Sequence, residues 1–113
     1  MSWNYNPHGG GNKIDKKLHP TIRNKIISYA ESKYSDSFDE LEVKFRGKFC
    51  YIQVKKDSDH FMPLARMRFF SMTSWSIAIF LYSNETYEPG FFANGEDLGT
   101  IEECVDYSSQ FFF

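Results

Sequence analysis

The sequence predicts one α+β domain, in which an N-terminal helix packs on a mostly antiparallel sheet of about five strands and a short helix follows. Three observations predict this fold. Residues 20–34 carry apolar side chains at helical spacing, and residues 41–54 alternate between apolar and polar side chains. The 113 residues also include 21 aromatic rings (12 Phe, 7 Tyr and 2 Trp), and aromatic residues favour strands. A chain of this length can bury a core without disulfides or metals.

Residues 1–17 are polar and glycine-rich, with a basic cluster at Lys13, Lys16 and Lys17. This composition predicts a flexible arm ahead of a single domain over residues 18–113. The functional alternative is an arm that binds nucleic acid or a protein partner, since its lysines and aromatic rings suit that role.

A helix is predicted over residues 20–34. Pro20 suits the first helical position, where its missing N–H costs nothing. Ile22, Ile26 and Ala30 then fall on one face, and the polar stretch at 35–37 ends the helix.

The clearest pattern is a hairpin over residues 41–54. Gly47 and Lys48 form a two-residue turn between two alternating runs. If Arg46 lies opposite Phe49, three apolar pairs share one face, namely Phe45 with Cys50, Val43 with Ile52 and Leu41 with Val54. A slip of one residue would expose all of these side chains, so the register is well specified.

A second strand pair is predicted over residues 64–70 and 75–82, joined by 71–74. With Phe70 opposite Trp75, the side chains of Ala65, Met67 and Phe69 would share the core face with those of the even-numbered residues 76, 78 and 80. Trp75 would then lie on the other side of the sheet, which we call the second face.

The last third of the chain predicts a strand near residues 87–92 and a helix over about 101–108. Thr100 and Glu103 have the spacing of a capping box at the start of that helix. The terminal run Phe111–Phe113 is too apolar to stay in water. We expect it to dock on the core or along a sheet edge, with self-association as the alternative.

The charges divide unevenly along the chain. All 13 basic residues lie at or before Arg68, whereas residues 69–113 contain seven acidic residues and no basic one. Such asymmetry is typical of a basic face beside an acidic one. The structural alternative is that Arg66 and Arg68 pair with Glu85, Glu88 or Asp97.

The second face is the candidate binding surface. Strand alternation gathers cations and rings there, and cations with aromatic rings are what single-stranded nucleic acid requires. The predicted contact residues are Lys44, Arg46, Tyr51, Arg66, Arg68 and Trp75. They predict a small non-enzymatic binding or accessory module with a protein or nucleic-acid partner.

Two alternatives remain open. A small enzyme would place its site near His60, with Cys50 as the nucleophile, although the hairpin register points that thiol into the core. An inhibitor of a nucleic-acid-binding protein would instead present the acidic residues of the last helix, Glu102, Glu103 and Asp106. No motif predicts a cofactor, and no metal-binding spacing is present.

The compartment is predicted to be the cytoplasm, and no membrane contact is expected. The N-terminus lacks the apolar stretch of a signal peptide, and two cysteines are fewer than a secreted domain of this size usually has.

Several segments resemble a family of small uncharacterised bacterial proteins. The resemblance rests on residues 45–52 (FRGKFCYI), 63–70 (PLARMRFF), 75–78 (WSIA), 82–89 (YSNETYEP) and 99–103 (GTIEE). It covers roughly residues 19–113 and implies a bacterial origin, a compact α+β domain and a common role for the strand with Arg66 and Arg68. It carries no catalytic or ligand-binding residue.

Overall fold

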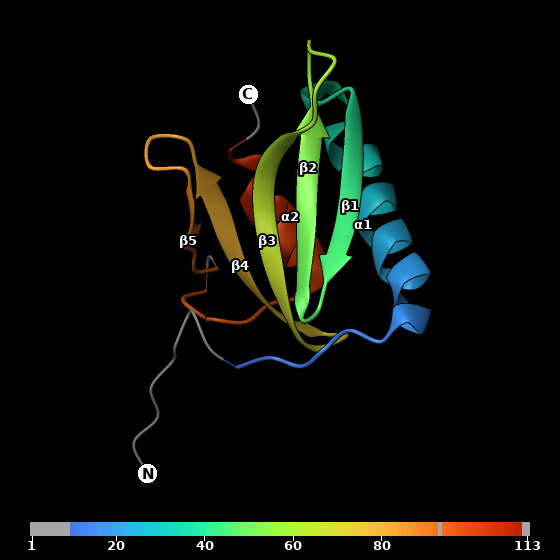
Figure 1. Cartoon of the computed structure of the whole chain (residues 1–113), viewed down its shortest axis with the longest axis vertical. Helices are drawn as coiled ribbons and strands as arrows, with labels where there is room; N and C mark the ends of the chain where they lie inside the picture. The colour runs from blue at the N-terminus through green and yellow to red at the C-terminus, as the bar shows by residue number, and fades with distance from the viewer. Residues whose placement is uncertain (1–9, 93, 112–113) are drawn as a thin grey trace.

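The fold consists of one five-stranded sheet with two α-helices on one of its faces, as seen in a computed structural model that describes residues 10–92 and 94–111 (Figure 1). The predicted α+β class and order of elements are confirmed. The α-helices are α1 (His19–Tyr34) and α2 (Ile101–Ser109), and short 3-10 turns, η1 (Lys16–Leu18) and η2 (Ser35–Ser37), flank α1. The strands are β1 (Glu40–Arg46), β2 (Phe49–Lys55), β3 (Met62–Ser71), β4 (Ser74–Leu81) and β5 (Thr86–Pro89). No helix among the described residues is long and apolar enough to cross a membrane.

The sheet is an antiparallel meander whose strands lie in the order of the chain, from β1 to β5. The predicted register of the first hairpin is confirmed at every pair, from Leu41 opposite Val54 to Arg46 opposite Phe49. Gly47 has a φ of +60°, a conformation that glycine adopts without the clash a Cβ atom would cause. Alternation and turn chemistry therefore agree on one register.

The predicted register of the second hairpin is wrong by one residue. Trp75 lies opposite Phe69, not Phe70, and the pairing is irregular between Phe69 and Ser71. The turn is also tighter than expected, since Ser71 already pairs with Ser74. Consequently Trp75 faces the helices with the other odd-numbered residues of β4, and the even-numbered ones lie on the second face.

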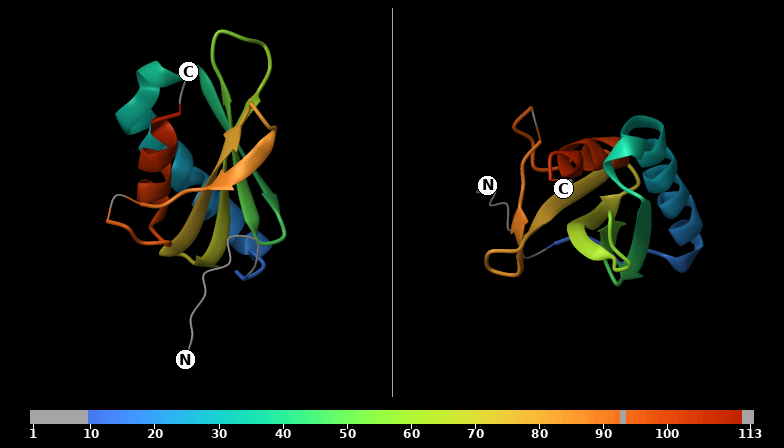
Figure 2. Two further views of the ribbon diagram at one scale, coloured as in Figure 1. Left: turned by 90° about the vertical axis from the view of Figure 1, so that its left-hand side faces the viewer. Right: turned by 90° about the horizontal axis from the view of Figure 1, so that it is seen from above.

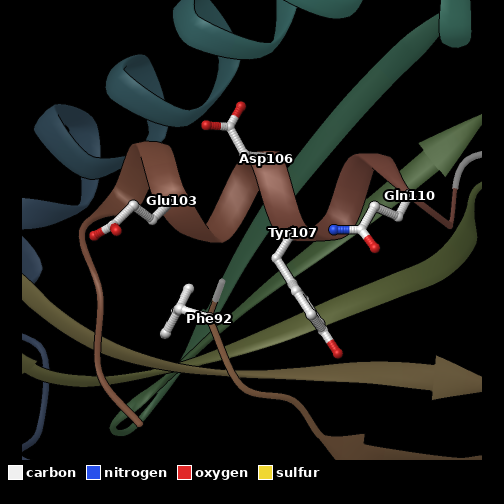
Figure 3. Close-up of a pocket in the computed structure, with 5 residues that line it drawn as sticks. All are labelled: Phe92, Glu103, Asp106, Tyr107 and Gln110. Atoms are coloured by element: carbon white, nitrogen blue, oxygen red, sulfur yellow. The ribbon is translucent and has the colours of Figure 1, made fainter. Parts of the chain in front are cut away.

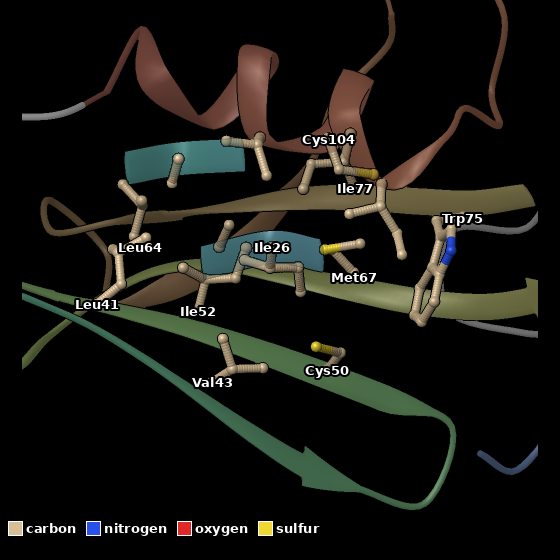
Figure 4. Packing of buried hydrophobic residues seen from close by; sticks show 14 of the residues in the cluster. Ile26, Leu41, Val43, Cys50, Ile52, Leu64, Met67, Trp75, Ile77 and Cys104 are labelled. Atoms are coloured by element: carbon tan, nitrogen blue, oxygen red, sulfur yellow. The ribbon is translucent and has the colours of Figure 1, made fainter. Parts of the chain in front are cut away.

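The core fills the space between the sheet and the two helices (Figure 4). Ile22, Ile26 and Ala30 of α1 are fully buried, one helical turn apart, which confirms the predicted apolar face. Cys104 of α2 packs against the same core. Each large apolar side chain buried in this way stabilises the fold by roughly 1.5–3 kcal/mol.

The segment that precedes η1 crosses the end of the sheet (Figure 1). The Asn12 N–H donates to the Phe69 carbonyl at 2.8 Å, and the Ile14 N–H donates to the Gly47 carbonyl at 3.0 Å. Ile14 is only 2% exposed and belongs to the core. Mobility of residues 1–17 stays a prediction, and residues 1–9 lie outside the described part of the chain.

The α2 helix begins with the predicted capping box. The Thr100 Oγ accepts from the Glu103 N–H at 3.1 Å, and the Glu103 carboxylate accepts from the Thr100 N–H at 2.9 Å. After the helix, Phe111 is 36% exposed and its ring lies 5.7 Å from that of Tyr107. Phe112 and Phe113 lie outside the described residues, so the docking of the terminal run stays a prediction.

Candidate functional site

The second face of the sheet is the side away from α1 and α2, and no described helix covers it (Figure 2). Strand register assigns the side chains that point to this face. They include Glu40, Glu42, Lys44, Arg46, Phe49, Tyr51, Gln53, Lys55, Pro63, Arg66, Arg68, Ser76, Ala78, Phe80, Tyr87 and Pro89.

Arg66 lies at the centre of this face, between two rings. Its guanidinium carbon is 4.6 Å from the centre of the Phe49 ring and 5.2 Å from that of the Tyr87 ring. Among the described residues, Arg66 forms no ion pair with a carboxylate, so the predicted pairing with Glu85, Glu88 or Asp97 is not found for this residue. A guanidinium between two rings is held by cation–π attraction instead.

The rings around Arg66 show that the second face is concave. Tyr51 of β2 and Tyr87 of β5 have ring centres only 5.8 Å apart, although β3 and β4 lie between their strands. In a flat sheet β2 and β5 would be about 14 Å apart, at roughly 4.8 Å per strand. The sheet therefore curls around this face (Figure 2). Phe80 extends the cluster, with its ring 5.1 Å from that of Tyr87.

Two of the predicted contact residues are not available at the surface. Trp75 is 0% exposed and belongs to the core on the helical side, with its indole N–H donating to the Met72 carbonyl, so its predicted place on the second face is wrong. Arg68 does lie on the second face, but it is 2% exposed. Gly11 lies so close to the Arg68 stem that a Cβ atom on the glycine would be 2.8 Å from the Arg68 Cγ. The Arg68 guanidinium carbon lies 5.4 Å from the centre of the Phe49 ring.

Lys44 and Arg46 of β1 are exposed at the edge of the face, as predicted. Five basic and two acidic side chains point to this face in total. Lys44 lies 3.5 Å from Glu42, and Lys55 lies 3.2 Å from Glu40. Exposed pairs of this kind are weak, about 0–1 kcal/mol each, so both cations remain able to attract an anionic ligand.

The hydroxyls of Tyr51 and Tyr87 form no hydrogen bond with any described residue. Burial raises the pKa of Tyr87 above its ordinary value, and the neighbouring Tyr51 adds to this while Arg66 opposes it. Tyrosine, with an ordinary pKa of about 10, is protonated at neutral pH in any case, so the Tyr87 O–H can donate to a ligand.

The arrangement of Cys50 and His60 gives no support to the enzyme alternative. Cys50 is at the beginning of β2 and fully buried, while His60 is exposed in the loop beyond the other end of that strand. Burial also raises the pKa of Cys50 to about 12, so its thiol is not a nucleophile at neutral pH. Across residues 10–92 and 94–111, no cluster of three or more His, Cys, Asp or Glu side chains could hold a metal ion.

The acidic residues of α2 are largely engaged within the protein. Glu103 completes the capping box. Asp106 accepts hydrogen bonds from Tyr29, Tyr34 and Lys33 of α1. This leaves little of the acidic surface on which the inhibitor alternative depends.

A small hollow lies along the outer side of α2 and was not anticipated from the sequence (Figure 3). Phe92, Glu103, Tyr107 and Gln110 surround it, while Asp106 turns toward α1. Its volume of about 220 Å³ is below the roughly 300–1,000 Å³ of most small-molecule sites. The hollow among Phe49, Arg66 and Arg68 on the second face is smaller still, at about 10 Å³, so that face is a candidate for surface contact and not for enclosing a small molecule.

Sequence reasoning also missed Tyr87 and Phe80 as parts of the second face. The wrong register of the second hairpin hid Phe80, because it assigned that side chain to the core. Tyr87 carried no local signal, since its contact with Tyr51 depends on the curvature of the sheet.

Comparisons of the chain with protein-family models, with curated proteins and with solved structures gave no match.

Proposed function

We propose that the protein is a small non-enzymatic binding module that contacts a protein or nucleic-acid partner through the second face of its sheet. The observation that carries this proposal is Arg66, held between Phe49 and Tyr87 on a concave face that no described helix covers.

The composition of this face supports binding. Arginine and tyrosine supply much of the binding free energy at protein interfaces, because they combine large contact area with polar groups. Here the Tyr87 ring contacts both the Tyr51 ring and the Arg66 guanidinium, so these side chains are ordered before any partner arrives. Pre-ordering lowers the entropy that association would otherwise cost.

We also propose a cytoplasmic location. Cys50 and Cys104 are both free, buried thiols, and free thiols are usual where the cell is reducing.

The test is a nuclear magnetic resonance titration of the labelled protein with three probes: a single-stranded oligonucleotide, polyglutamate and polylysine. We expect an anionic probe to shift backbone signals of Tyr51, Arg66 and Tyr87, and we expect α1 and α2 to be unaffected. Lys44→Glu should weaken this response. Lys25→Glu makes the same charge change on the exposed side of α1 and serves as the matched control. Shifts confined to the helices, or no shift with any probe, would refute the proposal.

A further inference from the structure

Resting on the proposed function, we infer that the partner is single-stranded nucleic acid. One of its bases would stack on Tyr51, and its phosphates would lie over Lys44 and Arg46.

The surroundings of the Tyr51 ring fit a splayed base. The ring centres of Phe49 and Tyr51 are 6.1 Å apart, and those of Tyr51 and Tyr87 are 5.8 Å apart at 63°. Both distances are well above the roughly 3.4 Å between stacked bases of one duplex strand. A base seated on Tyr51 would therefore have protein rings beside it and not a second base, as unstacked bases of single strands do.

The Phe49 ring is already engaged by cations. Arg66, Arg68 and Lys48 all lie within 6 Å of its centre, at 4.6, 5.4 and 5.8 Å. Arg66 lies over the Tyr87 ring as well, 5.2 Å from its centre. Of the rings of Phe49, Tyr51 and Tyr87, Tyr51 is therefore the one over which no described cation lies, and a base can stack on it.

Lys44 and Arg46 lie where the phosphates of a strand bound at Tyr51 would be. Lys44 is directly opposite Tyr51 in the β1–β2 register, and Arg46 is opposite Phe49. Opposite side chains on one face have Cβ atoms about 4.5–5.5 Å apart. A base on Tyr51 would therefore bring its own sugar–phosphate within reach of Lys44, and the next phosphate toward Arg46.

The same geometry discriminates against other anionic partners. A duplex hides the faces of its bases, so it would use the cations but not the concave ring surface. An acidic peptide would likewise use the cations alone. Dependence on the Tyr51 ring therefore separates a single strand from both.

The experiment measures fluorescence anisotropy of labelled oligothymidine and oligouridine of roughly 12 nucleotides, within the length range that single-strand modules bind. A matched duplex and polyglutamate are the comparison ligands. We expect the single strands to bind more tightly than the duplex. Between about 50 and 200 mM salt, log K should fall with log[salt] by about 0.7 per phosphate contact.

Three variants locate the contacts. Tyr51→Ala should weaken binding about 5- to 150-fold, the range for loss of one base-stacking ring, whereas Tyr51→Phe should retain most of the affinity. Arg46→Gln should lower the salt slope by about 0.7. Lys25→Gln, at an exposed position of α1, should change neither the affinity nor the salt slope. Circular dichroism melting of each variant confirms that it is folded.

The outcomes separate the two proposals. Tighter binding of thymidine or of uridine strands supports the inference, and the preference identifies DNA or RNA as the source. Binding of polyglutamate to the second face without oligonucleotide binding overturns the inference but leaves the binding module intact. Equal affinity for the duplex, or an unchanged affinity in folded Tyr51→Ala, also overturns it. A second face that responds to no probe overturns both.

Discussion

Asp106 joins the two helices, and its replacement by asparagine tests how they are held together. Its carboxylate accepts from the Tyr29 hydroxyl at 2.9 and 3.0 Å, from the Tyr34 hydroxyl, and from the Lys33 ammonium at 3.1 Å. Burial alone would raise the Asp106 pKa, but the bonds from Tyr34, Tyr29 and Lys33 outweigh it and lower that pKa. The folded protein therefore favours the charged carboxylate.

The magnitude follows from the number and exposure of these bonds. A hydrogen bond to a charged group contributes about 1.5–3 kcal/mol when it is shielded from water. The Asp106 side chain is 39% exposed, however, so screening reduces each contribution, and the ion pair with Lys33 is worth only about 0–1 kcal/mol. Asparagine also keeps one acceptor oxygen. We therefore expect Asp106→Asn to lower the free energy of unfolding by about 1–2 kcal/mol, or Tm by roughly 4–10 °C.

The assay is urea unfolding of both proteins across a range of pH. Because the folded pKa of Asp106 is lowered, its contribution is complete above the ordinary aspartate pKa of about 3.9 and disappears as pH falls through the lowered value. The stability difference between wild type and Asp106→Asn should thus be full at neutral pH and shrink in acid. Glu31→Gln removes a charge from an exposed position of α1 and is the control. A difference that is independent of pH, or equal in the control, would refute this account of Asp106.

Three further predictions test the packing. Trp75→Ala should cost about 3–5 kcal/mol in urea unfolding, as expected for a buried ring, and a cost within about 0.5 kcal/mol would mean that Trp75 is on the surface after all. Gly99→Ala should cost about 1–3 kcal/mol, since its Cβ would lie 2.9 Å from the buried Phe92 ring. Adding Phe92→Leu should recover part of that loss, and strict additivity would contradict the clash. Cys50 and Cys104 should resist a thiol reagent at mildly alkaline pH, because burial raises the pKa of both, and should react only on unfolding. Rapid reaction of the native protein would argue against their burial.

The first hairpin could be predicted in full because two independent signals coincided there. Strict alternation from Leu41 fixed the core face, and Gly47 fixed the position of the turn. The capping box at Thr100 was similarly local, since both of its partners lie within one helical turn.

The second hairpin could not be placed in the same way because both of its faces are rich in apolar residues. The sequence of β4 is Trp75-Ser76-Ile77-Ala78-Ile79-Phe80. Either its odd-numbered or its even-numbered side chains could face the core, because both sets are largely apolar. The side of the sheet on which Trp75 lies is determined by a residue distant in the sequence, Gly99. Trp75 exchanges two backbone hydrogen bonds with Gly99, at 2.8 and 2.9 Å, and this bridge holds Trp75 beneath the segment that leads to α2.

The candidate site could likewise be predicted only where local alternation places its residues. Lys44, Arg46 and Tyr51 follow from alternation in one hairpin, and the structure places all three on the second face. The burial of Arg68 under Gly11 depends on a contact between residues far apart in the chain, which no local pattern reports.

The sequential order of the strands has a consequence for how the chain folds. Every strand pairs with its neighbour in sequence, and the turns of two hairpins are only two residues long, so the sheet can grow by closing short loops. Contact between α1 and α2 is different, because Tyr29 and Asp106 are 77 residues apart. Closing so long a loop carries a larger entropic penalty. We therefore expect the meander to form early and the two helices to meet late, so substitutions in their contact should mainly change the rate of unfolding.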